Sequence, residues 1–304
     1  MTAAARTIGS LLLAGAGILG AVPLRAQEAQ EPAPPPRPPE GSVIINLPSA
    51  EVSSPATLTL LFTHRFSQPV QDSDIHSLFS FDSAADIKIG LAYSPLRNLE
   101  ISLERDPAHC FCGLGGTSSL AAPQGLEIYE LGAKYRLISG GPLSFALRLG
   151  GDWRMAQGLD NHVTFFAQAI AGVSIGPRIR ITAIPTYVSK TSGQPLFRSI
   201  PVASYNDVFN VAGALSVALT RSINVHGEVL PRVARGGARG VGWIASLEKT
   251  VLRHRFAFTV GNLRATTVDQ YIASDFRQAR AGAPNFAPQD LYLGFNLVRQ
   301  WSLK

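Results

Sequence analysis

The connections between the expected strands of this chain alternate between short and long along almost its whole length. Twelve segments have side chains that alternate between apolar and polar, which is the pattern of a strand, because successive side chains of a strand point to opposite faces. The links after the even-numbered segments are tight, as in Gly176-Pro177, and those after the odd-numbered segments are mostly long, as in Arg264–Asp290. The segments are Thr57–Phe66, Ala85–Tyr93, Asn98–Asp106, Glu127–Leu137, Leu143–Trp153, Val163–Ile175, Arg178–Tyr187, Phe209–Leu219, Ile223–Pro231, Val241–Lys249, Arg255–Leu263 and Leu291–Leu303.

Links that are short after even-numbered strands and long after odd-numbered strands predict a closed barrel in a membrane. Outer-membrane barrels combine an even number of antiparallel strands with short periplasmic turns and longer extracellular loops. The strands expected here run about nine to thirteen residues, the length that a tilted strand needs to cross a bilayer. A soluble β-sandwich is the alternative, but its loops do not sort by parity. We therefore expect an all-β fold, a closed antiparallel up-and-down transmembrane β-barrel of about 12 strands.

The hairpin Ala85–Asp106 shows the alternation most clearly. Apolar residues such as Ile89 and Leu91 alternate with polar ones such as Lys88, and Ser94–Arg97 is expected to form the turn. In a membrane barrel the apolar face meets lipid and the polar face lines the lumen. The hairpin therefore predicts one unit of a lipid-facing wall.

The N-terminus predicts export. Residues 1–26 combine a basic start, an apolar segment and a small residue, Ala26, at their end, and are expected to be a cleaved signal peptide. Residues 27–55 begin with a proline-rich tract and are expected to form a periplasmic leader or linker. The barrel is expected over residues 56–304. Its last strand alternates and carries a late aromatic, Trp301, which resembles the signal read by the barrel-assembly machinery.

The composition fits a barrel and argues against a nucleic-acid-binding protein. Only 16% of the residues are charged, and the chain holds 28 glycines. The net charge of +6 is spread over the chain, whereas nucleic-acid binding calls for a dense basic face.

Several segments resemble a family of bacterial β-barrel proteins, the domain of unknown function numbered 5777. The matching segments are THRF at Thr63–Phe66, FSFDSAADIKIGLAYSPLRNLEISLERD at Phe79–Asp106, YELGAKYRL at Tyr129–Leu137 and LGFNLVRQW at Leu293–Trp301. The resemblance implies a membrane barrel, and none of the matching motifs is catalytic.

The polar faces of the expected strands place charges of both signs in the lumen. Two interpretations stay open: the charges pair across a narrow barrel and fill it, or they line a polar channel and set its selectivity. We expect Glu100 to reach Lys88 across its hairpin and Arg148 to reach Glu130 across the next. The candidate lumen residues are Lys88, Glu100, Glu104, Glu130, Lys134, Arg136, Arg148, Asp152, Arg178, Arg180, His226, Glu228, Glu248 and Arg255.

Two cysteines lie close together in the second long link. In an exported protein, Cys110 and Cys112 are expected to form a disulfide. A soft-metal site with His109 as a third ligand, or two free thiols, are the alternatives. We assign no metal or other cofactor to the chain.

The sequence predicts no enzyme. His64 is expected on the lipid-facing side of the first strand, but the adjacent strands have no serine expected on that side. The chain also has no nucleophile-elbow motif. His64 and Arg65 are expected at the level of the lipid headgroups. Asp72, Asp74 and His76 are expected to be solvated loop residues.

The expected function is porin-like passage of small polar solutes across the outer membrane of a Gram-negative cell. The alternative is a closed structural or binding barrel whose extracellular loops recognise a partner or ligand; an embedded outer-membrane hydrolase is the least favoured. Expected partners are outer-membrane lipid, lipopolysaccharide and the barrel-assembly machinery, with no nucleic acid.

Overall fold

The structure is a computed structural model, which describes residues 41–66, 68–83, 85–107, 127–155, 161–191, 206–231, 241–263, 265–273 and 290–303. The described residues all belong to one compact unit of the chain, Pro36–Lys304. The expected signal peptide, the proline-rich tract before residue 41, and the sequence around Cys110 and Cys112 lie outside the described residues.

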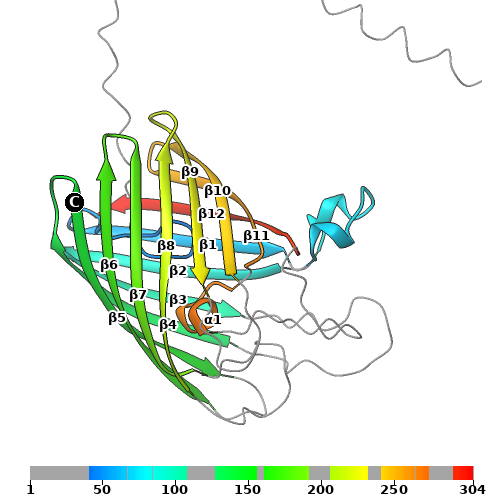
Figure 1. Ribbon diagram of the computed structural model, residues 1–304, viewed down its shortest axis with the longest axis horizontal. Coiled ribbons are helices and arrows are strands. Elements are labelled where there is room, and N and C mark those ends of the chain that lie inside the picture. The colour runs from blue at the N-terminus through cyan, green and yellow to red at the C-terminus, as the bar shows by residue number, and fades with distance from the viewer. Residues whose placement is uncertain are drawn as a thin grey trace, which may run out of the picture. The chain divides into compact units, whose positions relative to one another are not determined.

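Twelve strands of the described chain close into one antiparallel barrel (Figure 1). Each strand pairs with its neighbours in sequence, and β12 returns to β1, where Thr57 lies opposite Ser302. The predicted fold class is therefore confirmed. The strands are β1 (Thr57–Phe66), β2 (Ala85–Leu96), β3 (Leu99–Pro107), β4 (Glu127–Ile138), β5 (Leu143–Met155), β6 (His162–Ile175), β7 (Ile179–Thr191), β8 (Asn206–Ala218), β9 (Ile223–Pro231), β10 (Val241–Val251), β11 (His254–Gly261) and β12 (Tyr292–Ser302).

Three short helices lie in the described parts of the links between strands. The 3-10 helices η1 (Val70–Asp72) and η2 (Leu78–Ser80) lie between β1 and β2, and α1 (Val268–Ala273) lies between β11 and β12. In the part of the chain that the structure describes, no helix is both long and apolar enough to cross a membrane.

The outward side chains of the strands are apolar and exposed. Leu149 and Phe165, on neighbouring strands, are 61% and 63% exposed. An exposed apolar surface on this scale marks contact with a membrane or a partner. Aromatic side chains flank the band, as the interfacial girdles of membrane barrels do. Near the turn end they include Tyr93, Tyr135 and Trp301, and near the long-link end Tyr129, Trp153 and Tyr187.

The strand ends that the tight turns join lie at one end of the barrel, and the strand ends that the long links join lie at the other, as expected. One turn is displaced from its predicted position, because β2 continues to Leu96 through a bulge after Tyr93. A bulge accommodates Pro95, which has no backbone N–H to offer the ladder. Another turn is longer than predicted: β7 begins at Ile179, and Arg178 belongs to the turn.

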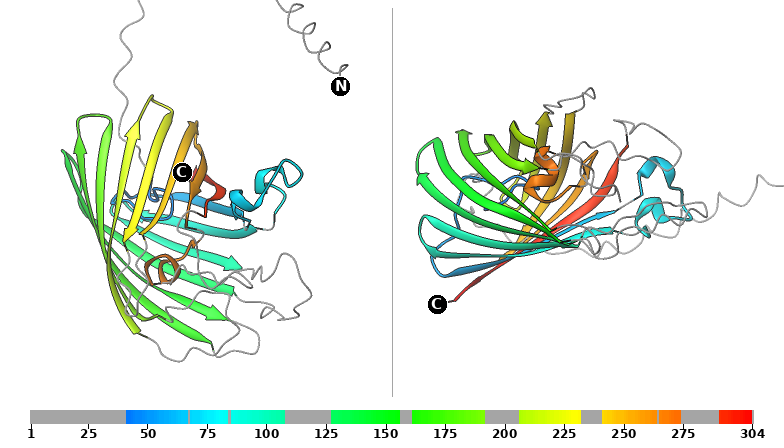
Figure 2. Two further views of the ribbon diagram at one scale, coloured as in Figure 1. Left: turned by 45° about the vertical axis from the view of Figure 1, so that its right-hand side comes forward. Right: turned by 90° about the horizontal axis from the view of Figure 1, so that it is seen from below.

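The apolar core lies inside the barrel. It forms between the inward side chains of β5–β10 and two segments that enter the lumen, residues 41–55 and α1. Figure 2 shows α1 within the curve of the strands. Residues 41–55 were expected to belong to a periplasmic leader, but their side chains are largely buried against the barrel. The core includes Ile44, Ile45 and Leu47 of the first segment, Val268, Tyr271 and Ile272 of the second, and Phe166, Ile170, Ile184, Val188, Leu230 and Ile244 of the wall.

Candidate functional site

Residues 41–55 enter the lumen as a hairpin, which we call the N-terminal hairpin. Val43 pairs with Pro48 as an isolated bridge, and the backbone N–H of Ile44 donates to the carbonyl of Leu47 at 2.8 Å. The turn between them presents consecutive N–H groups in one direction. Such a concave set of donors binds an anion.

The anion that fills this turn is the carboxylate of Glu228. It accepts hydrogen bonds from the backbone N–H groups of Ile45, Asn46 and Leu47 at 2.8, 3.0 and 2.9 Å. Asn296 of β12 holds the same turn, because its side-chain amide donates to the carbonyl of Ile45 at 2.8 Å. The tip of the hairpin is thus held by two strands, β9 and β12.

Charged residues hold the base of the N-terminal hairpin at the turn end of the barrel. Glu51 lies 2.8 Å from Arg180 and 3.4 Å from Arg136, and so joins β7 to β4. Lys134 donates to the carbonyl of Ser42 at 3.0 Å. Arg255 donates to the neighbouring carbonyl of Val43 at 3.2 Å.

Helix α1 enters from the other end and is held by two wall carboxylates. Its first N–H groups, those of Val268 and Asp269, donate to Glu130 at 2.9 Å and to Asp152 at 2.7 Å. The first N–H groups of a helix have no partner within the helix, and the helix dipole favours negative charge there. The side chain of Asp269 in turn pairs with Arg154 at 2.7 Å.

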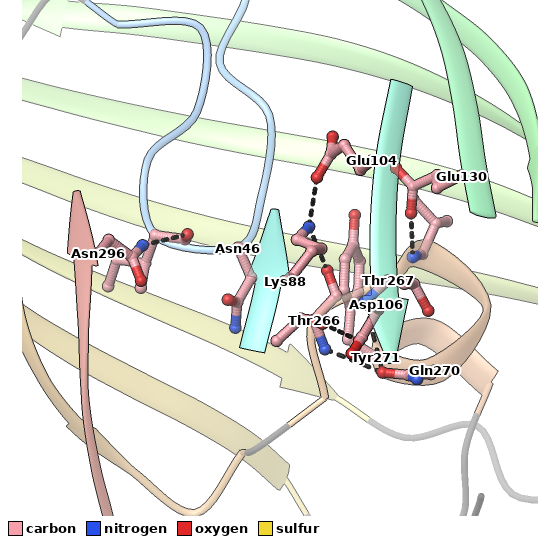
Figure 3. Close-up of polar contacts among 12 residues, drawn as sticks. Asn46, Lys88, Glu104, Asp106, Glu130, Thr266, Thr267, Gln270, Tyr271 and Asn296 are labelled. Atoms are coloured by element: carbon pink, nitrogen blue, oxygen red, sulfur yellow. Dashed lines mark hydrogen bonds and ion pairs between the residues drawn. The ribbon is translucent and has the colours of Figure 1, made fainter. Parts of the chain in front are cut away.

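The residues before α1 are held by a second set of contacts, drawn in Figure 3. Lys88 donates to the carbonyl of Thr266 at 2.7 Å and pairs with Glu104 at 2.6 Å. The hydroxyl of Thr266 donates to Asp106, and its N–H donates to Gln270 at 3.0 Å.

Tyr271 of α1 packs into the core of the lumen and is 2% exposed. Gln168 of β6 lies 3.5 Å from its hydroxyl. Burial, together with the nearby charge of Glu130, raises the pKa of Tyr271 well above its ordinary value. The ring of Tyr271 belongs to the apolar core of the lumen.

The structure buries most of the predicted lumen residues. Arg136, Arg180 and Arg255 also point inward, with partly covered side chains. Arg178 does not join this set, because it is exposed in its turn. The buried members are Lys88, Glu100, Glu104, Glu130, Lys134, Arg148, Asp152, His226, Glu228 and Glu248.

The pairing of these charges differs in part from the prediction. Arg148 pairs with Glu130 at 2.5 Å, as expected. Glu100 pairs with Lys134 at 3.0 Å rather than with Lys88, because these two residues lie directly opposite each other on β3 and β4. Lys88 reaches Glu104 instead.

Sequence reasoning missed Arg65, which is 1% exposed and points inward. Its guanidinium donates to Asn46 at 2.9 Å and to Asn296 at 2.8 Å. The expectation that Arg65 lies at the headgroup level was therefore wrong. The alternation of side chains along β1 could have predicted the inward orientation, because Arg65 lies on the same face as the buried Thr59 and Thr63.

A small cavity lies between the N-terminal hairpin, α1 and the wall. Its volume is about 40 Å³. That volume holds a few water molecules, whereas small-molecule sites take about 300 Å³ or more. The lining includes Asn46, Lys88, Glu104, Lys134, Arg148 and Thr266.

Two histidines, His226 and His64, have surroundings that bear on catalysis. His226 lies 2.8 Å from the hydroxyl of Ser216 and 3.7 Å from Glu248, but all three side chains are buried. On the outer wall, His64 lies opposite Ile87 and Phe295, so no serine of the described strands lies directly across from it. Within the described ranges, no group of three or more histidine, cysteine or acidic side chains is arranged to hold a metal ion.

A family of membrane-bound β-barrel domains, the domain of unknown function 5777, matches residues 40–301 of the chain. The chain belongs to this family. The matched residues include the N-terminal hairpin, so the part of the chain that fills the lumen falls within the family's own extent. No curated protein matches the chain.

Three solved structures are similar to this member of the family. The KdgM porin in complex with disordered oligogalacturonate is 8% identical, with a TM-score of 0.46, 81% of this chain covered and 99% of that chain. Outer membrane phospholipase A from Escherichia coli is 12% identical, with a TM-score of 0.41 and coverages of 86% and 98%. Wzi from Escherichia coli, a carbohydrate-binding β-barrel, is 14% identical, with a TM-score of 0.28 and coverages of 72% and 52%.

Proposed function

We propose that this protein is an outer-membrane β-barrel that is closed in its resting state and acts through its surfaces. The filled lumen is the observation that carries this proposal. Polar and charged contacts fix the N-terminal hairpin and α1 at both ends of the barrel, and apolar side chains pack between them. The long links at the loop end are then the parts that recognise a partner or ligand.

The proposed location is the outer membrane, with the tight turns in the periplasm. The apolar outer wall, the aromatic girdles and the parity of the links support it. Lipopolysaccharide and phospholipid would surround the wall, and the barrel-assembly machinery would insert it. We propose no catalytic role, because His64 has only apolar neighbours across its strands.

Planar-bilayer conductance of the purified full chain tests the closed state. We expect no discrete current steps from the unmodified protein. A variant lacking residues 41–50 removes most of the N-terminal hairpin and is expected to conduct. Heat-modifiable migration on a gel serves as the control that the variant still folds. Regular open steps from the unmodified protein would overturn the closed barrel.

Porin-like passage of small polar solutes is the second candidate. The charged wall of β2–β5 favours it, because Lys88, Glu100, Glu104 and Lys134 would face a solute once α1 and the hairpin moved aside. Under this proposal the unmodified protein conducts, and Lys134→Gln changes the ratio of cation to anion current. Swelling of proteoliposomes in small sugars gives an independent readout of the same passage.

A further inference from the structure

The outer wall of β9–β12 carries an apolar groove of about 390 Å³. Strand register brings its lining together, because Leu247 lies opposite Phe258 and Phe258 opposite Phe295. All three side chains face outward and are exposed. The volume lies in the range of small-molecule sites. The wall residues between these side chains, Glu248, Ala257 and Asn296, complete the lining and are themselves buried.

The turn end of the groove is basic. Lys249 lines the groove itself and lies opposite both Ile223 and Phe256. Arg253 follows in the turn after β10, and Arg299 of β12 lies opposite His254. All three cations are exposed.

Each of the three cationic residues makes a backbone or side-chain contact with its surroundings. The carbonyl of Arg253 accepts a hydrogen bond of 3.1 Å from the N–H of Gln300. The ammonium of Lys249 donates to the hydroxyl of Ser222 at 2.8 Å. The guanidinium of Arg299 stacks 4.9 Å from the ring centre of Trp301. These contacts join the patch to the turn between β8 and β9 and to β12.

Among the residues that the structure describes, acidic side chains do not offset this patch at the surface. At the turn end, Glu51 is paired with Arg136 and Arg180, and Glu248 is buried beside Arg255. The acidic residues of the described ranges that are exposed or partly exposed elsewhere all lie at the long-link end. They are Asp72, Asp74, Asp82, Glu127, Asp207 and Asp290.

We propose that this groove and patch bind an anionic phospholipid, with an acyl chain along Leu247, Phe258 and Phe295 and the phosphate at Lys249, Arg253 and Arg299. A lipid joins a long apolar chain to a phosphate, which matches an apolar groove with basic residues at one end on a wall that faces the bilayer. Lysine and arginine near an interface extend their charged ends toward the headgroups, and both bind phosphate. The proposal does not depend on whether the lumen is closed.

Trp301 gives a local test, because the chain has three tryptophans and the other two, Trp153 and Trp243, lie at the long-link end. The W153F/W243F variant of the full chain leaves Trp301 as the reporter. In mixed vesicles, we expect brominated phosphatidylglycerol to quench Trp301 with a relative affinity about fivefold above that of brominated phosphatidylcholine. The preference should fall as salt is raised.

K249Q/R253Q, in the same background, should abolish the preference. The matched control is R97Q/R178Q, which removes two exposed arginines from turns on other hairpins of the same end and should retain it. Equal quenching by the two lipids in the parent, or an equal loss in both double variants, would overturn the proposed site. Inorganic phosphate should not compete, and competition at millimolar concentration would contradict a lipid ligand. If W153F/W243F does not fold, native mass spectrometry of the unmodified protein measures retention of the same two lipids.

Discussion

Glu228 accepts a hydrogen bond of 2.8 Å from the backbone N–H of Ile45, which lies 183 positions earlier in the chain. One carboxylate of β9 thereby organises the turn of a segment that is not part of the barrel wall. The contact is buried on both sides, since Ile45 is 1% exposed and Glu228 is 1% exposed. The plugged lumen depends on long-range contacts of this kind rather than on the hairpin's own structure.

Glu228→Gln is expected to loosen the N-terminal hairpin without unfolding the wall. A hydrogen bond to a charged group contributes about 1.5–3 kcal/mol, and the amide of glutamine would turn a donor toward the donors of the turn. Amide hydrogen exchange of peptides from residues 41–50, followed by mass spectrometry, should become about 10- to 100-fold faster. Glu127→Gln, in an exposed ion pair with Arg105, is the control and should leave this exchange unchanged. Unaltered exchange in E228Q would show that the apolar contacts alone hold the hairpin.

Lys88→Met is expected to destabilise the protein strongly. Lys88 pairs with Glu104 and donates to the carbonyl of Thr266, and all of these groups are buried. Removing one partner of a buried ion pair costs about 3–5 kcal/mol, because the other charge is left uncompensated. Urea unfolding in lipid vesicles measures this free energy. The double variant K88M/E104L should lose less free energy of unfolding than the sum of the losses in the two single variants. Strictly additive losses would argue against an interaction between Lys88 and Glu104.

Gly150→Ala tests how closely the strands approach one another inside the barrel. A Cβ at Gly150 would lie 2.2 Å from the carbonyl oxygen of Leu131 and 2.3 Å from Phe166, so the backbone would have to move. Gly227→Ala is the matched control, because a Cβ there has no described atom within 4 Å. The midpoint temperature of thermal unfolding should fall for G150A, because overpacking typically costs about 1–3 kcal/mol of stability. It should change little for G227A. Equal effects at the two sites would contradict the close approach.

The wall of the barrel was predictable from the sequence, because alternation and turn spacing are local properties of a strand. Both ends of β1 and β9 match their predicted bounds, and each lumen charge except Arg178 faces inward. The predicted ion pair of Lys88 and Glu100 does not form, and the alternation of side chains along a strand could not have shown this. Partners depend on the stagger between strands, which places Glu100 opposite Lys134.

The contents of the lumen were not predictable in the same way. Residues 41–55 and α1 have no alternation of their own, and their backbones are satisfied by side chains far away in sequence, such as Glu130 for Val268. An apolar run such as Val43–Leu47 following a proline-rich tract was the available signal that the leader does not stay in solvent. The apolar inward residues of β6 and β7, such as Ile170 and Ile184, were a second signal, because a water-filled lumen would be polar.

Leu149→Arg separates a lipid-facing wall from an ordinary exposed surface. Leu149 and Leu303 are both 61% exposed, so a soluble protein would tolerate arginine at either position. In a bilayer the cost depends on depth, at about 2–4 kcal/mol near the midplane and about 0–1 kcal/mol near the interfaces. Leu149 is central in β5, whereas Leu303 follows the last strand at the turn end. The free energy of unfolding, measured with urea in vesicles, should therefore fall for L149R and change much less for L303R. Equal tolerance of the two substitutions would place this face of the barrel in water.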